Sequence, residues 1–169
     1  MEIALRPWQE SDLRQLIKLA NNKRIADFMT DGFPHPYNEE AGRKFIAMAS
    51  GHDPVRIMTI TADNNLAGGV GLHPASDISR MNAELGYWIA EPFWNKGIAT
   101  AAVSQMVKRG FELFEFTRIF ARPFGHNKAS QRVLTKCGFV HEATIRDGFI
   151  KNGQYCDELI YALRREAKH

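Results

Sequence analysis

Residues 81–100 combine a strand-like run, a turn and a helix start, and this transition constrains the fold more than any other segment. Apolar residues alternate with other residues from Met81 to Ala90, as in a β-strand with one buried face. A helical pattern follows Gly97. The first amides of a helix have no partner within it, and the helix dipole adds partial positive charge there. Because glycine and the small Ala99 allow a large anion to approach these amides, the segment predicts a phosphate-binding helix start.

Periodic patterns elsewhere predict a single mixed α/β sheet. Strand-like patterns cover residues 3–6, 55–61, 66–73, 81–90, 118–122, 139–145 and 155–163. Helical patterns follow the candidate caps Ser11 or Asp12, Asn38 and Asn127, as well as Gly97. The order is strand, two helices, three strands, helix, strand, helix and two strands, so we expect helices on both faces of one sheet. The length of 169 residues suits one domain over residues 1–169.

Composition and charge limit the function classes without selecting one. The formal net charge is +3 and the basic residues are spread along the chain, which suits an anionic small ligand as well as nucleic acid. The 6 histidines and 2 cysteines have no metal-ligand spacing, so we expect neither a metal nor a disulfide framework. No apolar run reaches the roughly 20 residues of a membrane span, and the first residues do not resemble a leader. We therefore expect a cytoplasmic protein without a membrane partner.

Four motifs stand in a fixed order along the chain: residues 84–89 (ELGYWI), 93–100 (FWNKGIAT), 127–139 (NKASQRVLTKCGF) and 152–161 (NGQYCDELIY). Together they resemble the GCN5-related N-acetyltransferases, and more closely their RimJ/RimL-like branch, over nearly the whole chain. The resemblance implies transfer of an acetyl group from acetyl-CoA to an amine. It also implies about seven mostly antiparallel strands, in which a central splayed parallel pair holds the acyl-CoA.

The phosphate loop of this family is written Gln/Arg-x-x-Gly-x-Gly/Ala, and Gly97 and Ala99 match it. Trp94 stands where the Gln or Arg would be, a departure that costs little because the donors are backbone amides. The resemblance therefore assigns pyrophosphate binding to the amides of Asn95, Lys96, Gly97, Ile98, Ala99 and Thr100. The alternative interpretation is an ordinary helix start.

Two further segments are expected to bind the cofactor. The strand residues Trp88 and Ile89 should offer backbone groups to the pantetheine arm and an amide to the oxyanion. Asn127 is predicted to cap a helix, and the resemblance adds a hydrogen bond from it to the pantetheine.

Glu84 is the first candidate for the general base. It lies on the strand face opposite the apolar set, from which it would accept the amine proton directly or through a water. A lysine-like amine, with a pKa near 10.4, needs such a base more than an α-amine near 8. The alternatives are a solvated carboxylate and an ion pair with a nearby arginine.

Ser130 is the candidate proton donor to the departing thiolate. In the wider superfamily a tyrosine often holds the position of Leu134 and acts as the general acid, and leucine cannot donate a proton. In RimJ/RimL-like proteins a serine at the position of Ser130 is the proposed substitute, and it would also contact the cofactor. The alternative is a small residue that packs the helix against the sheet.

The residues expected near the acceptor are Tyr37, Glu84, Trp88 and Asp157. Tyr37 lies in a proline-stiffened loop that is a candidate acceptor lid, while Asp157 has a turn or ion-pair role as its alternative.

We expect direct transfer in a ternary complex, because neither cysteine looks like an acyl carrier. The expected partners are acetyl-CoA and a protein N-terminal α-amine or small-molecule amine, with no nucleic acid, in a monomer or homodimer. A non-catalytic acyl-CoA-binding sensor or interaction module is the alternative, motivated by Leu134.

Overall fold

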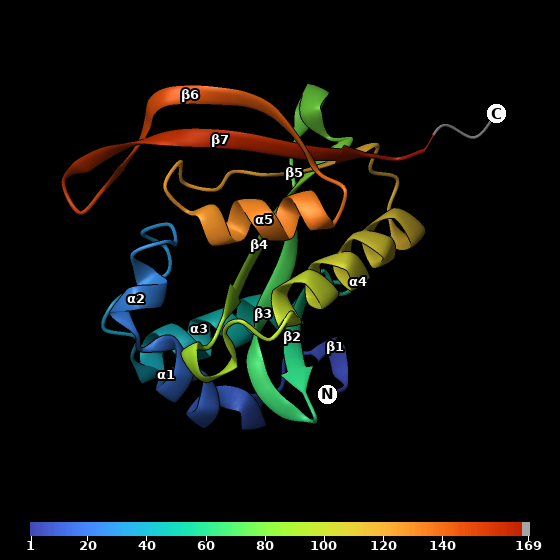
Figure 1. Ribbon diagram of the computed structural model, residues 1–169. Helices are drawn as coiled ribbons and strands as arrows, with labels where there is room; N and C mark the ends of the chain where they lie inside the picture. Colours follow the sequence, from blue (N-terminus) through green and yellow to red (C-terminus); the bar gives the residue numbers. More distant parts are fainter. Residues whose placement is uncertain (167–169) are drawn as a thin grey trace. The chain divides into compact units, whose positions relative to one another are not determined.

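A seven-stranded sheet in the order β1-β2-β3-β4-β5-β7-β6 organises the chain in the computed structural model, which describes residues 1–166 (Figure 1). Its strands are β1 (Ile3–Pro7), β2 (Ile57–Ala62), β3 (Asn65–Pro74), β4 (Asn82–Ile89), β5 (Arg118–Ala121), β6 (Val140–Lys151) and β7 (Gln154–Arg164). The β4–β5 pair is parallel, whereas β1–β2, β2–β3, β5–β7 and β6–β7 are antiparallel. This confirms the expected mixed sheet with a parallel pair in its middle.

Local capping sets the helix boundaries. The helices are α1 (Leu13–Ala20), α2 (Lys23–Ala26), α3 (Glu39–Ser50), α4 (Ile98–Leu113) and α5 (Lys128–Lys136). The side chains of Asn38 and Asn127 cap α3 and α5, as predicted. The four-residue helix α2 was not expected, because it is too short to show a periodic pattern.

Asp12 precedes α1 as predicted, but its side chain does not cap that helix. The carboxylate instead accepts hydrogen bonds from Arg6, at 2.7 and 2.8 Å, and from the Gln9 amide at 2.9 Å. Burial of Asp12 favours its neutral form, but the hydrogen bonds from Arg6 and Gln9 outweigh that effect and lower its pKa. Asp12 therefore ties the end of β1 to the turn before α1.

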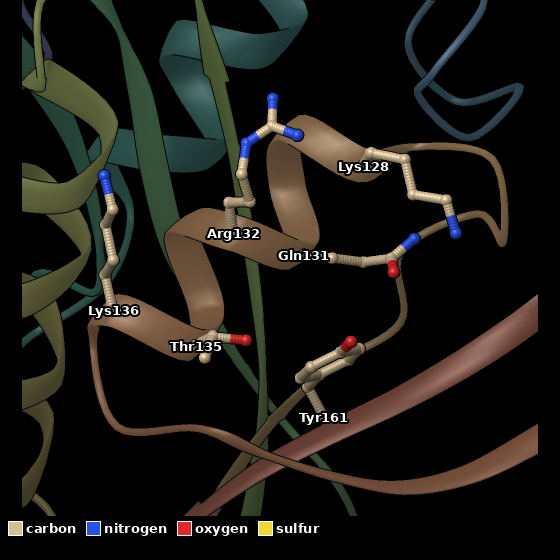
Figure 2. Close-up of a pocket in the computed structure, with 6 residues that line it drawn as sticks. All are labelled: Lys128, Gln131, Arg132, Thr135, Lys136 and Tyr161. Atoms are coloured by element: carbon tan, nitrogen blue, oxygen red, sulfur yellow. The ribbon is translucent and has the colours of Figure 1, made fainter.

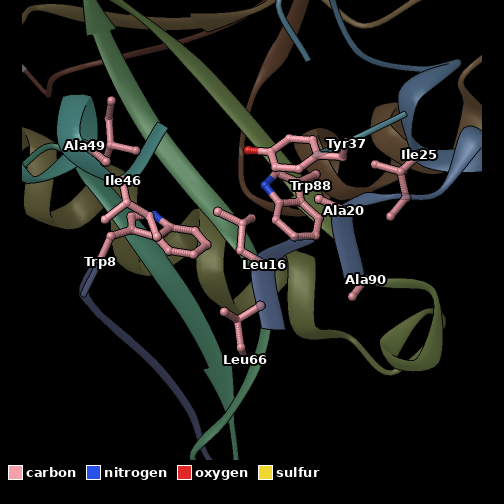
Figure 3. Close-up of a cluster of buried hydrophobic side chains, with 11 residues drawn as sticks. Trp8, Leu16, Ala20, Ile25, Tyr37, Ile46, Ala49, Leu66, Trp88 and Ala90 are labelled. Atoms are coloured by element: carbon pink, nitrogen blue, oxygen red, sulfur yellow. The ribbon is translucent and has the colours of Figure 1, made fainter. Parts of the chain in front are cut away.

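Two compact units are distinguished within the chain. The first contains Met1–Gly71 and Tyr87–Ala102, and the second contains Leu72–Gly86 and the chain from Val103. In the first unit α1 contacts α3, and α3 contacts β2. Its hydrophobic core includes Trp8, Leu16, Ile46 and Trp88 (Figure 3). Full burial of an aliphatic side chain such as Leu16 or Ile46 stabilises the fold by about 1.5–3 kcal/mol.

In the second unit β6 and β7 form a long hairpin (Figure 1). β6 extends to Lys151, beyond the predicted end at Ile145. A register shift between Ile145 and Phe149 leaves the residues between them out of the regular pairing, and the strand continues after it. The predicted turn at Asn152 and Gly153 is present between the two strands. The hairpin therefore gives β7 a paired strand on each side, namely β5 and β6.

No helix within residues 1–166 combines the length and apolar character needed to span a membrane. In the same residues, no three His, Cys, Asp or Glu side chains form a group suited to a metal ion.

Candidate functional site

The predicted phosphate loop lies directly before α4 and has an unusual backbone. Gly97 has φ +73° and Asn95 has φ +60°, so two residues adopt left-handed conformations before the helix begins at Ile98. Glycine adopts this region without the steric cost that a side chain brings. A Cβ atom at Gly97 would meet no described atom within 4 Å. The backbone beside the first helical amides is therefore open, as anion binding requires.

Trp94 anchors this loop. Its indole Nε1 donates a hydrogen bond to the Ile89 carbonyl oxygen at 2.7 Å, and the Arg24 guanidinium lies 4.8 Å from its ring centroid. Arg24 also forms an ion pair with Glu91, and the Asn22 amide donates to the same carboxylate at 2.6 Å. Trp94, which stands in place of the usual Gln or Arg, thus makes structural contacts within the loop. Through Arg24, α2 supports the loop. Sequence analysis missed Arg24 and Glu91, which are 67 residues apart.

The Lys96 side chain folds back onto the loop. Its Nζ donates to the Pro92 carbonyl oxygen at 2.9 Å and lies 5.6 Å from the Phe93 ring centroid. Ile98 is only 1% exposed, so its side chain belongs to the core and only its backbone faces a ligand. The arrangement fits a loop whose donors are main-chain amides.

β4 and β5 share a short parallel register. It pairs Asn82 with Arg118, Ala83 with Ile119 and Glu84 with Phe120, while β4 continues to Ile89. Glu84 is therefore the last β4 residue in this register. Residues 85–89 of β4 therefore lie beyond the pairing with β5.

Glu84 is held by an arginine. Arg122 Nε and Nη2 donate to the two Glu84 carboxylate oxygens at 3.0 and 3.1 Å, and its Nη1 donates to Glu158 at 3.1 Å. Hydrogen bonds to Glu84 raise the pKa of the Arg122 guanidinium, although partial burial opposes this effect. The ion pair that was an alternative for Glu84 is therefore present. Its role as a base stays a prediction.

Asn127 and Ser130 lie together at the start of α5. Asn127 Oδ1 accepts from the Ser130 amide at 3.2 Å, which confirms the predicted cap. Ser130 is half-buried, and Leu134 one turn later is fully buried. The contribution of Ser130 to chemistry stays a prediction.

Two predicted acceptor residues, Tyr37 and Trp88, meet in the first unit (Figure 3). The ring centroid of Phe33 is 5.3 Å from that of Tyr37 and 5.7 Å from that of Trp88. A Cβ atom at Gly69 would lie 2.9 Å from Trp88 Nε1, so the glycine makes room for the indole. Burial raises the pKa of Tyr37 to about 12, so this hydroxyl stays protonated at neutral pH.

Asp157 has a structural contact in the second unit. Its Oδ1 accepts from the Asp147 amide at 3.1 Å, within the irregular part of β6, and its carbonyl oxygen accepts from the Gly125 amide at 2.8 Å. Asp157 thus has a structural contact that lies between strands rather than in the expected turn, and its contact with an acceptor stays a prediction.

A hollow of about 490 Å³ lies between α5 and β7 (Figure 2). Its lining consists of Lys128, Gln131, Arg132, Thr135, Lys136 and Tyr161. The three cations stand at every fourth position of α5, and none of them has an ion-pair partner within residues 1–166. Sequence analysis missed this surface, although the helical spacing of the three cations was a usable signal.

Comparison with known proteins gives one family match and several relatives. Residues 2–140 match the family model described as "Acetyltransferase (GNAT) domain". The Bacillus subtilis protein named "Putative ribosomal N-acetyltransferase YdaF" is 38% identical over 101 residues, which cover 60% of this chain. The matched part covers 55% of that relative, so the chain spans about half the length of it.

Solved structures match over nearly the whole chain. RimL, a ribosomal L7/L12 alpha-N-protein acetyltransferase solved with coenzyme A, has a TM-score of 0.85 at 23% identity, covering 96% of this chain and 93% of its own. The spermidine N-acetyltransferase of Vibrio cholerae, solved with CoA and spermine, has a TM-score of 0.80 at 25% identity. That match covers 96% of this chain and 95% of the other. The RimL likeness indicates a shared fold.

Proposed function

The chain belongs to the GNAT acetyltransferase family, and on this premise we propose that it transfers an acetyl group from acetyl-CoA to a primary amine. Acetyl-CoA is the cosubstrate of the family, and relatives are solved with CoA bound. The observation that carries the proposal is the loop before α4, where Gly97 leaves the backbone open beside the first residues of the helix.

Main-chain amides of residues 95–100 are the proposed pyrophosphate donors. Lys128, Arg132 and Lys136 on α5 have no ion-pair partner among residues 1–166, and their positive charge would suit a polyanion such as CoA. Asn127, half-buried at the start of α5, is the proposed hydrogen-bond partner of the pantetheine arm.

Bound acetyl-CoA supplies a thioester, whose carbonyl carbon the amine nitrogen attacks as the carbon–sulfur bond breaks. Glu84 takes the proton released by the amine, directly or through a water. Ser130 donates a proton to the departing thiolate, for which weak donation suffices because a thiol pKa near 8.5 makes it a fair leaving group. Backbone amides at Trp88 and Ile89 stabilise the oxyanion.

Direct transfer is proposed because the cysteines are poor acyl carriers. Burial raises the pKa of the Cys156 thiol, and the carboxylates of Asp157 and Asp147 raise it further. A thiol with a raised pKa forms less of the thiolate that would attack a thioester. Cys137 lies at the end of α5, with its Sγ 3.4 Å from the Ser104 hydroxyl.

The proposed acceptor is a protein N-terminal α-amine or a small-molecule amine. The names of the similar proteins include both a ribosomal-protein acetyltransferase and a spermidine acetyltransferase. A non-catalytic acyl-CoA-binding module is the second candidate function, because the buried Leu134 cannot act as the general acid.

An assay of free-thiol release separates these two functions. Acetyl-CoA is incubated with the protein and a panel of polyamines, small amines and short peptides with free N-termini. We expect release above the hydrolysis rate with at least one acceptor. Tight binding of CoA without turnover on any acceptor would instead support the binding module.

A further inference from the structure

Arg122 makes three hydrogen bonds to two carboxylates. Two of its nitrogens contact both oxygens of Glu84, at 3.0 and 3.1 Å, and the third contacts Glu158 at 3.1 Å. A planar guanidinium presents this fork of donors in a fixed geometry, which a lysine ammonium cannot reproduce. The Glu84 carboxylate therefore has a defined orientation as well as a nearby charge.

These contacts join three strands at one level of the sheet. Glu84 is the last β4 residue in the β4–β5 register, Arg122 follows directly after β5, and Glu158 belongs to β7. Glu158 is placed by an isolated β-bridge to Phe124. Through Arg122, the Glu84 carboxylate is therefore connected to the end of β5 and to Glu158 of β7, at the point where β4 leaves the parallel pair.

Charge and exposure describe the surroundings of Glu84 within this cluster. One guanidinium balances only one of the two carboxylates, so the trio retains a net negative charge. The Glu84 side chain is 31% exposed and Glu158 is 14% exposed, which leaves Glu84 the more accessible of the two. On its other side Arg122 lies 5.8 Å from the Phe149 ring centroid, a distance at which a ring attracts the cation.

We propose that Arg122 is the positioning residue for Glu84 and holds the carboxylate in the orientation from which it takes the acceptor's proton. Glu158 holds Arg122 in turn. This inference rests on the proposed acetyl transfer. A purely structural ion pair is a weaker explanation, because exposed pairs contribute little to stability.

A double-mutant cycle on kcat tests the inference, using Arg122→Met, Glu84→Gln and the combined variant of the full chain. We expect Glu84→Gln to lower kcat by about 100-fold, as for loss of a general base. Arg122→Met should lower it by about 10-fold, with the KM for acetyl-CoA unchanged. The combined variant should be no slower than Glu84→Gln alone, because Arg122 acts only through Glu84.

Two additional variants separate positioning from folding and from charge. Arg122→Lys keeps the charge but loses the fork, and it should stay impaired by at least about 3-fold. Arg118→Met is the matched control: Arg118 is the first residue of β5 and pairs with Glu142 at 2.8 Å, and its substitution should keep the parental kcat.

Multiplied losses in the combined variant would overturn the inference, as would an unchanged kcat in Arg122→Met or in Glu84→Gln. If the parental protein shows no turnover on any amine, the proposed function fails instead.

Discussion

At the scale of single residues, we propose that donor binding depends most on Gly97. At a φ of +73° a side chain would strain the backbone, and it would also fill the open space beside this residue. The sequence alone predicted a helix start after Gly97, because a helix start depends on residues that are close together in the chain.

We predict that Gly97→Glu weakens acetyl-CoA binding by at least about 10-fold, equivalent to about 1.4 kcal/mol. The substituted carboxylate would place bulk and negative charge beside the amides that are proposed to bind the pyrophosphate. Isothermal titration calorimetry measures the change in Kd.

Gly153→Glu is the matched control for this substitution. Gly153 has φ +75° and also has no described atom within 4 Å of its added Cβ position. Both variants therefore suffer the same backbone strain of about 1–2 kcal/mol. Equal losses of binding in the two variants would show that strain, and not the loop, causes the effect.

At the scale of elements, local signals predicted more than non-local contacts did. Asn38 and Asn127 were recognised as caps because a cap depends on residues within one turn. The contact between Glu84 and Arg122 spans 38 residues, so the sequence named Glu84 as the candidate base and offered an ion pair with an unspecified arginine as the alternative. The predicted site residues came from motifs, while their partners came from the fold.

Helix α2 illustrates what sequence patterns leave out. Its four residues show no periodicity, yet Arg24 connects it to Trp94 and Glu91 at the phosphate loop. The motif departure at Trp94 is thus compensated by a residue from an earlier element. We infer that α2 keeps the loop in its binding conformation.

Arg24→Ala is therefore expected to weaken acetyl-CoA binding by about 3- to 10-fold, since an exposed cation–π contact contributes about 0.5–1 kcal/mol and the ion pair adds to it. Arg43→Ala is the control, because Arg43 is similarly exposed and pairs with Glu39 on α3 at 2.6 Å. Calorimetric Kd values compare the two. Unchanged binding in Arg24→Ala, or an equal loss in Arg43→Ala, would contradict the bracing role.

At the scale of the whole molecule, the family match and the mixed sheet both indicate a GNAT acetyltransferase domain. The match ends at residue 140, so most of β6 and all of β7 lie beyond it. Asp157 and Glu158 belong to that hairpin, and Glu158 holds Arg122. The expected cofactor loop thus lies within the family match, whereas Asp157 and Glu158 lie beyond it, and a role of their hairpin at the acceptor stays a prediction.

We propose that the protein transfers the acetyl group directly from acetyl-CoA to a primary amine. The most direct test supplies acetyl-CoA labelled with carbon-13 in the acetyl group, together with spermidine and a peptide with a free N-terminus. Mass spectrometry then measures the label on each acceptor and on the intact protein. We predict one labelled acetyl group on an amine and none on Cys137 or Cys156. Label retained on the protein, or bound CoA without any acetylated acceptor, would contradict the claim.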